Sequence, residues 1–197
     1  RLENLIGDVR DFTRPSRPQG QWGDLYPCIR DTLELMENAL ASQNIHCEAS
    51  LPDHPPQVWH DPRQMKQVLI NLTKNALEAM PDGGELFIST GQDADFVRIE
   101  IKDTGRGIPE EIMKKLFHPF FSTKAKGTGL GLAVSYKLVQ DHGGEITVWS
   151  APDQGARFTV RLPLSGPAQT PPDLTSPDHT PTDSDSPTST SPSGEFA

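Results

Sequence analysis

An aspartate followed by two closely spaced glycines, in the segment DTGRGIP, has residue types that suit recognition of a flat ring carrying an amino group. Asp103 ends the segment 96–102, whose alternation of apolar and charged residues is typical of a half-buried strand. A carboxylate only accepts hydrogen bonds, so it selects a ligand with an amino group, such as adenine. Gly105 and Gly107 let the backbone approach the ring closely, because they have no Cβ.

A second glycine-rich segment, GTGLGL at 127–132, precedes an apolar pattern of helical spacing. A glycine loop that enters a helix N-terminus exposes free N–H groups and the positive end of the helix dipole, which favour a phosphate. The segment is not a Walker loop, because no Gly-Lys-Ser/Thr closes it, and it does not follow a strand as a Rossmann loop does. Together with Asp103, this loop predicts a nucleotide site.

Residues 61–80 form a predicted helix in which Asp61 suits the N-cap position. An apolar stripe at helical spacing consists of Met65, Leu69, Leu72, Ala76 and Met80. Asn71, Asn75 and Glu78 share another face of the helix. A solvated polar face is the ordinary alternative, but asparagine is a mediocre helix former. Its carboxamide oxygen is a hard ligand that suits Mg²⁺ already held by phosphates.

Four segments resemble, in the right order, the conserved boxes of sensor histidine kinases. NLTKNALEA resembles the N box, DTGRGIP the G1 box, FHPFFSTK the F box and GTGLGLA the G2 box. The resemblance covers roughly residues 20–164, and the run HDPRQMKQVLINLTKNALEAM is closest to sensor kinases related to the nitrogen-regulation kinases. These kinases share a superfamily with gyrase, chaperone and mismatch-repair ATPases.

The resemblance implies a protein histidine kinase domain that binds ATP and Mg²⁺. Asn75 is expected to coordinate Mg²⁺, with Asn71 as a second candidate ligand, and Asp103 to bind the adenine amino group. Lys74 and Lys124 are expected to contact phosphates. The other ATP-binding residues implied by the resemblance are Gly105, Gly107, Ile108, Phe117, Thr123, Gly127, Thr128, Gly129, Leu130, Gly131, Leu132 and Thr159.

These residues need a scaffold, and the family implies an α/β two-layer sandwich with a mixed, largely antiparallel sheet and helices on one face. The expected helices are 24–43, 61–80, 110–116 and one that follows Gly127. The expected strands are 45–49, 85–90, 96–102, 145–150 and 156–162. We expect a linker at 19–23 and an ATP lid at 117–127.

Three domains are expected: 1–18, 19–164 and 165–197. The first is an amphipathic helix stub that resembles the end of the dimerisation and phosphoacceptor hairpin, with an ordinary capping helix as the alternative. The second is the catalytic ATP-binding domain. The third contains 20 Pro, Ser and Thr residues among 33 and no Lys or Arg, so we expect a disordered tail.

None of the six histidines has the setting of a phosphoacceptor, which we therefore assign to sequence preceding Arg1. The expected partners are a second copy, joined through that preceding hairpin, and a response regulator receiver domain. The net charge of −9 says little about nucleic acid, because it falls to about −4 without residues 165–197, but no basic stripe indicates such a partner and we expect none. We expect no membrane contact within this chain and a cytoplasmic location, with any membrane anchor in preceding sequence.

The sequence leaves three alternatives open. An ATPase of the same superfamily carries a Glu that activates water where this chain has Asn71, and Asn cannot accept the proton. A protein serine kinase of the same fold is disfavoured by the helix stub. A non-enzymatic nucleotide-sensing dimerisation module is disfavoured by the complete set of boxes.

Overall fold

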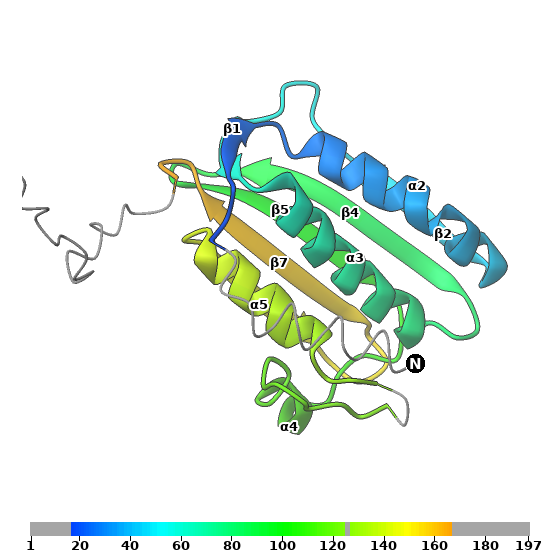
Figure 1. Cartoon of the computed structure of the whole chain (residues 1–197). Helices are drawn as coiled ribbons and strands as arrows, with labels where there is room; N and C mark the ends of the chain where they lie inside the picture. The colour runs from blue at the N-terminus through cyan, green and yellow to red at the C-terminus, as the bar shows by residue number, and fades with distance from the viewer. Residues whose placement is uncertain (1–16, 125–126, 167–197) are drawn as a thin grey trace, which may run out of the picture.

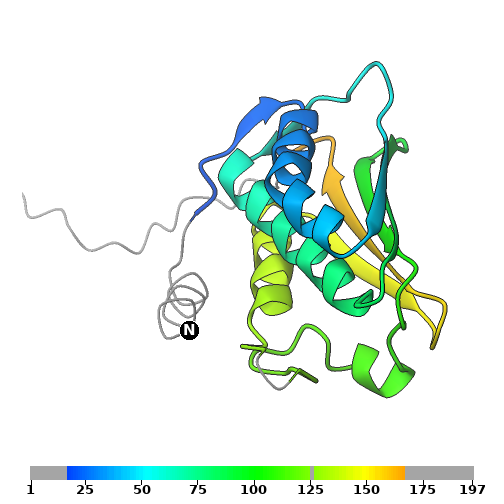
Figure 2. The same ribbon diagram turned by 90° about the vertical axis from the view of Figure 1, so that its right-hand side faces the viewer.

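A five-stranded sheet covered by three helices on one face forms the body of the protein (Figures 1 and 2). The computed structural model describes residues 17–124 and 127–166, so the predictions for the helix stub and the tail lie outside the described residues. The strands run in the order β2-β4-β5-β7-β6, and only the β2–β4 pair is parallel. The predicted two-layer sandwich, with its mixed and largely antiparallel sheet, is confirmed.

The strand bounds follow the alternation of the sequence. The strands of the sheet are β2 (Ile45–Ser50), β4 (Gly84–Gln92), β5 (Phe96–Asp103), β6 (Glu145–Ser150) and β7 (Ala156–Pro163). In β5, Val97, Ile99 and Ile101 are buried while Arg98 and Lys102 are exposed, so one face of the strand packs on the core and the other faces solvent.

The helices that cover the inner face are α2 (Tyr26–Ser42), α3 (Pro62–Ala79) and α5 (Gly131–Asp141). A single turn of helix, α4 (Glu110–Met113), lies apart from this layer near the end where α3 finishes (Figure 1). Within the part of the chain that the structure describes, no helix is both long enough and apolar enough to span a bilayer.

The central helix α3 begins where the sequence predicts, at an Asp-Pro pair. The Asp61 carboxylate accepts hydrogen bonds from the backbone N–H groups of Arg63 (2.9 Å) and Gln64 (3.3 Å), which satisfies two donors that the first turn leaves free. Its other oxygen accepts from the Gln19 N–H at 2.8 Å. The Asp61 cap thus fixes both the start of α3 and the segment that leads into the domain.

A buried histidine joins the start of α3 to the end of α5. The Nε2 of His142 accepts the Asp61 backbone N–H at 2.9 Å, and its Nδ1 lies 2.7 Å from the Leu138 carbonyl oxygen. These two contacts select the neutral ring with its proton on Nδ1. Burial lowers the pKa of His142, although the Leu138 carbonyl opposes that shift.

Two local predictions were wrong. Residues 19–23 were expected to be a linker, but Gln21–Gly23 forms strand β1, which pairs antiparallel with β3 (Val58–His60). Three residues carry too little pattern to predict a strand, and β1 depends on a partner that is distant in sequence. The helix expected at 110–116 ends at Met113, after which the chain continues as turns.

The burial of neutral His142 predicts a pH-dependent stability. Because the folded-state pKa lies below the unfolded value of about 6.5, the unfolded chain binds the extra proton, and the free energy of unfolding falls as pH drops below that value. We expect His142→Gln to reduce this pH dependence and to cost about 1–3 kcal/mol at pH 8, because a buried hydrogen bond is disturbed. Urea unfolding at pH 8.0 and 5.5 measures both, with the exposed His46→Gln as control. An equal slope in wild type and His142→Gln would contradict the prediction.

Candidate functional site

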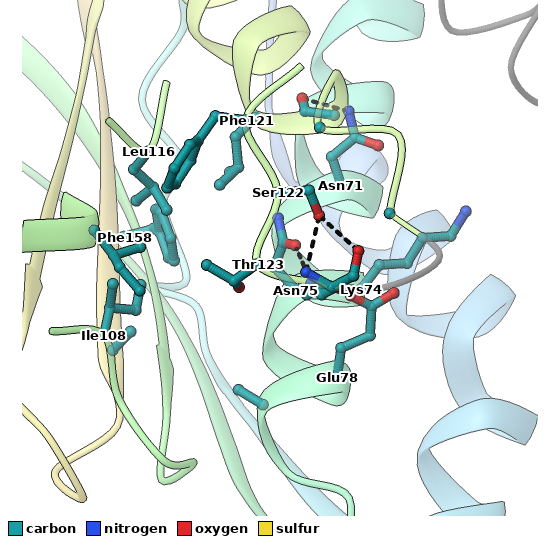
Figure 3. A pocket seen from close by; sticks show the side chains of 18 of the residues that line it. Asn71, Lys74, Asn75, Glu78, Ile108, Leu116, Phe121, Ser122, Thr123 and Phe158 are labelled. Atoms are coloured by element: carbon teal, nitrogen blue, oxygen red, sulfur yellow. Dashed lines mark hydrogen bonds and ion pairs between the residues drawn. The ribbon is translucent and has the colours of Figure 1, made fainter. Parts of the chain in front are cut away.

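A cavity of about 920 Å³ lies between the second half of α3, the turn after β5, the segment before α5 and the first turn of α5 (Figure 3). Its volume is in the range of pockets that bind small molecules. It brings together thirteen of the predicted site residues: Asn71, Lys74, Asn75, Asp103, Gly107, Ile108, Thr123, Lys124, Gly127, Thr128, Gly129, Gly131 and Leu132.

Four predicted residues do not line the cavity. Gly105 packs against the end of α3, and Phe117 packs on the ring of Tyr136 at 5.3 Å between centroids. Leu130 is fully buried beneath the start of α5. Thr159 lies on the solvent face of β7, because successive side chains of a strand alternate and its neighbour Phe158 faces inward.

Asp103 is the buried acid of the cavity, with 2% of its surface exposed. Its Oδ1 accepts hydrogen bonds from the backbone N–H groups of Gly105 (2.9 Å) and Ala156 (3.2 Å). Burial raises the pKa of the Asp103 carboxyl, and the two N–H donors act against that rise. Because the recorded bonds use Oδ1 alone, Oδ2 is the oxygen with capacity for a ligand donor.

The turn that follows Asp103 is held from both sides. The Arg106 N–H donates to the Ala79 carbonyl at the end of α3, and the Asp153 N–H donates to the Arg106 carbonyl. The Ile108 N–H donates to the Ser150 hydroxyl at 2.8 Å. Gly107 has a φ of +70°, and a Cβ there would collide with the Ala151 carbonyl oxygen. This turn is therefore a rigid wall in which Gly107 is required.

Asn71 faces the start of α5. Its Nδ2 donates to the Gly131 carbonyl at 3.1 Å and to the Ser135 hydroxyl at 3.3 Å, which ties the second half of α3 to the glycine loop. Within residues 17–124 and 127–166, its Oδ1 has no hydrogen-bond partner, and Asn71 lines the cavity (Figure 3). This neutral oxygen can therefore accept a donor or a hard cation.

Asn75 lies one turn further along α3 and contacts a lysine side chain. Its Oδ1 accepts a hydrogen bond from the Lys124 ammonium at 3.0 Å. The same ammonium forms an ion pair with Glu78, on the next turn of the helix. Lys74 also lines this part of the cavity, so the described residues place the ammonium groups of Lys74 and Lys124 and the Glu78 carboxylate beside the asparagines.

The other half of the cavity is apolar and contains residues that the sequence analysis did not single out. They include Ile112, Leu116, Phe121 and Phe158. Leu116 and Phe158 lie across the cavity from the asparagines (Figure 3). The alternation in 156–162 could have identified Phe158, whereas Ile112 and Leu116 lie in the expected helix 110–116, which is too short for its pattern to show which side chains face a cavity. An apolar half beside a polar half suits a ligand with a flat ring and a charged chain.

The polar half offers amide rather than carboxylate ligands to a metal. Among the described residues, no group of three or more His, Cys, Asp or Glu side chains could hold a metal ion. Asn71 and Asn75 provide neutral hard oxygens, which bind Mg²⁺ weakly unless a ligand supplies phosphate oxygens. The donor set therefore fits a metal that arrives with a phosphorylated ligand.

The family model described as "Histidine kinase-, DNA gyrase B-, and HSP90-like ATPase" matches residues 60–166. Sporulation kinase E of Bacillus subtilis (strain 168) is 39% identical over 165 residues, which are 83% of this chain and 22% of that protein. The chain therefore spans about a fifth of the length of this relative.

The chain is also similar to solved structures of histidine kinases. The nucleotide-free catalytic domain of histidine kinase ThkA is 35% identical with a TM-score of 0.68, and the match covers 74% of this chain and 97% of that one. ThkA in complex with the response regulator protein TrrA is 30% identical with a TM-score of 0.71, over 83% of this chain and 47% of that one.

The family match spans more than half of the chain, and the ThkA domain is covered almost completely. The matched range contains the second half of α3, the turn after β5 and the glycine loop, which are the elements that build the cavity. The chain therefore belongs to the histidine kinase-, DNA gyrase B- and HSP90-like ATPase family, and it carries the ATP-binding catalytic domain of a histidine kinase.

Proposed function

We propose that the cavity binds ATP with Mg²⁺ and presents the γ-phosphate to a histidine on a dimerisation hairpin outside this chain. The observation that carries the proposal is the pairing, in one cavity, of a buried acid with an asparagine-lined helix face and a glycine loop at a helix N-terminus. The acid suits adenine, and the other end suits phosphates.

At the adenine end, Asp103 Oδ2 would accept the amino group, while the ring would lie among Ile108, Leu116 and Phe158. The carboxylate is held in place by the Gly105 and Ala156 N–H groups, so no rearrangement is needed before a ligand binds. Such pre-organisation reduces the ordering cost of binding.

At the phosphate end, the first turn of α5 supplies free N–H groups and the positive end of the helix dipole. Lys74 and Lys124 add two cationic groups. Asn75 would coordinate Mg²⁺, with Asn71 as a second candidate ligand. When bound, Mg²⁺ supplies charge neutralisation on the phosphates, and the chain's own residues position the nucleotide.

In a histidine kinase, hydrolysis of ATP by an activated water molecule would compete with phosphoryl transfer to the histidine. Asn71 has no basic group that can accept a proton from water, and its amide is committed to Gly131 and Ser135. The carboxylate in the polar half, Glu78, is paired with Lys124. Both features favour a kinase over a hydrolase.

The partners follow from the same proposal. The phosphoryl group on the hairpin histidine would pass to an aspartate of a response regulator receiver domain, in a homodimer assembled through the hairpin. The ThkA–TrrA complex supports this assignment, because a similar catalytic domain occurs there in a kinase bound to its regulator. Such a relay would operate in the cytoplasm, and the described residues include no membrane-spanning helix.

Replacing the proposed metal ligand should remove nucleotide binding without unfolding the domain. Asn75→Ala deletes the oxygen proposed for Mg²⁺, so we expect most Mg²⁺-dependent ATP binding to be lost in titration calorimetry, with an unchanged melting temperature. Asn38→Ala, at an exposed position on α2, is the matched control. Equal ATP affinities for Asn75→Ala and Asn38→Ala would contradict the metal assignment.

Replacing the buried acid should weaken adenine recognition specifically. In Asp103→Asn, the amide oxygen can keep the Gly105 and Ala156 N–H bonds, which places the NH₂ group where the adenine amino group would donate. A mismatched buried donor costs about 1–3 kcal/mol, so ATP affinity should fall by roughly 5- to 150-fold. GTP presents a carbonyl at the corresponding ring position, so the ATP-to-GTP preference should fall as well. An unchanged preference would place the adenine pocket elsewhere.

Radiolabel chemistry separates the kinase from its alternatives. Incubated alone with labelled ATP, the chain should hydrolyse it very slowly and take up no acid-labile label. A separate hairpin domain carrying an acceptor histidine should become labelled, though weakly, because the pieces lack the effective concentration that tethering provides. Brisk turnover by the chain alone would favour a hydrolase, and acid-stable label on a partner would favour a serine kinase.

A further inference from the structure

The ammonium group of Lys124 is bound to α3. Lys124 belongs to the segment before α5, yet its Nζ donates to Asn75 Oδ1 at 3.0 Å and forms an ion pair with Glu78. Asn75 and Glu78 are three residues apart on α3, so they lie on the same face of the helix. An ammonium has three donors, and these two contacts use two of them.

This arrangement conflicts with the positions that bound nucleotide would require. Asn75 Oδ1 is the oxygen proposed for Mg²⁺, and Lys124 Nζ is a proposed phosphate partner. A cation on Asn75 Oδ1 would repel the Lys124 ammonium at hydrogen-bond distance. A bound Mg²⁺ would therefore displace Lys124 from Asn75, and Glu78 and a phosphate would then compete for the ammonium.

We propose that Glu78 sets the nucleotide affinity of this site by competing with the phosphates for Lys124. In this arrangement, Glu78 holds the ammonium beside Asn75, and the phosphates of a nucleotide would have to draw Lys124 away from this ion pair. The inference rests on the proposed ATP site. The phosphate-binding residues raise the affinity for ATP, whereas Glu78 lowers it. Glu78 is thus an affinity-setting residue that acts through Lys124.

The exposure of the pair determines how large the effect can be. The Lys124 side chain is 34% exposed and the Glu78 side chain 53%, so solvent and salt screen their attraction. Among the described residues that line the cavity, the other cationic side chains are Lys74 and Arg106, so releasing Lys124 changes a substantial part of the positive charge near the phosphates. We therefore expect a modest effect that weakens as salt concentration rises.

The first experiment measures ATP affinity in the presence of Mg²⁺ by titration calorimetry for wild type, Glu78→Gln and Glu37→Gln. Glu78→Gln removes the competing charge and nearly preserves the side-chain shape. We expect it to bind ATP about 2- to 5-fold more tightly than wild type at low salt, in line with the strength of a half-exposed ion pair. The gain should diminish at ~1 M salt, where the screening length is about 3 Å.

The control Glu37→Gln removes one negative charge at an exposed position on α2, away from the cavity. It should bind ATP as wild type does, which shows that net charge alone does not explain the gain. Unchanged or weaker binding by Glu78→Gln would overturn the inference, because a residue that merely positions Lys124 for the phosphate would weaken binding when replaced. No ATP binding by wild type would instead contradict the proposed function.

A double-mutant cycle tests whether Glu78 acts through Lys124. Lys124→Met removes the ammonium but keeps an unbranched apolar chain, and it should bind ATP more weakly than wild type. In this background, Glu78→Gln should change the ATP affinity by a factor close to one. A gain that persists without Lys124 would mean that Glu78 simply repels the phosphates, and competition for Lys124 would be wrong.

Discussion

The hydrogen bond from the Asp61 N–H to His142 Nε2 connects the two helices between which the phosphate end of the cavity lies. It joins the start of α3 to the end of α5, and the Asn71 amide joins the same helices near the other end through Gly131 and Ser135. Two polar ties at opposite ends leave the helices little freedom to slide or rotate. The asparagine face and the glycine loop therefore keep their relative position, and the neutral state of a buried histidine supports a site far from it along both helices.

The opposite wall depends on a buried charge that the backbone holds in place. Asp103 is costly to bury, and its two N–H partners come from the turn after β5 and from the start of β7. The turn is itself bound to the end of α3 and to the loop between β6 and β7. The wall around Asp103 and the asparagine face are thus connected, because the turn after β5 binds the end of the helix that carries both asparagines.

The sequence predicted those parts of the site whose signal is local. The Asp-Pro start of α3, the asparagines at helical spacing and the glycines around Asp103 each follow from neighbouring residues. Thr159, which the family resemblance implied, does not line the cavity, because alternation along β7 places it on the opposite face from Phe158. The contact between Lys124 and Glu78 could not be predicted, because 46 residues separate them and the contact depends on how an irregular segment folds back on α3. Strand β1 was missed for the same reason, because it forms only by pairing with β3, which lies in a distant part of the sequence.

The two ends of the described chain approach the same pair of indole rings. A Cβ on Gly20 would meet the Trp59 ring, and one on Gly166 would lie 3.4 Å from Trp22 and 3.5 Å from Trp59. These rings belong to the β1–β3 ribbon, at the end of the sandwich where α3 begins, whereas the cavity lies toward the end where α3 finishes (Figure 1). The described chain therefore enters and leaves the domain at the end opposite the cavity, so a pull on either end would load the β1–β3 ribbon before it reached the cavity.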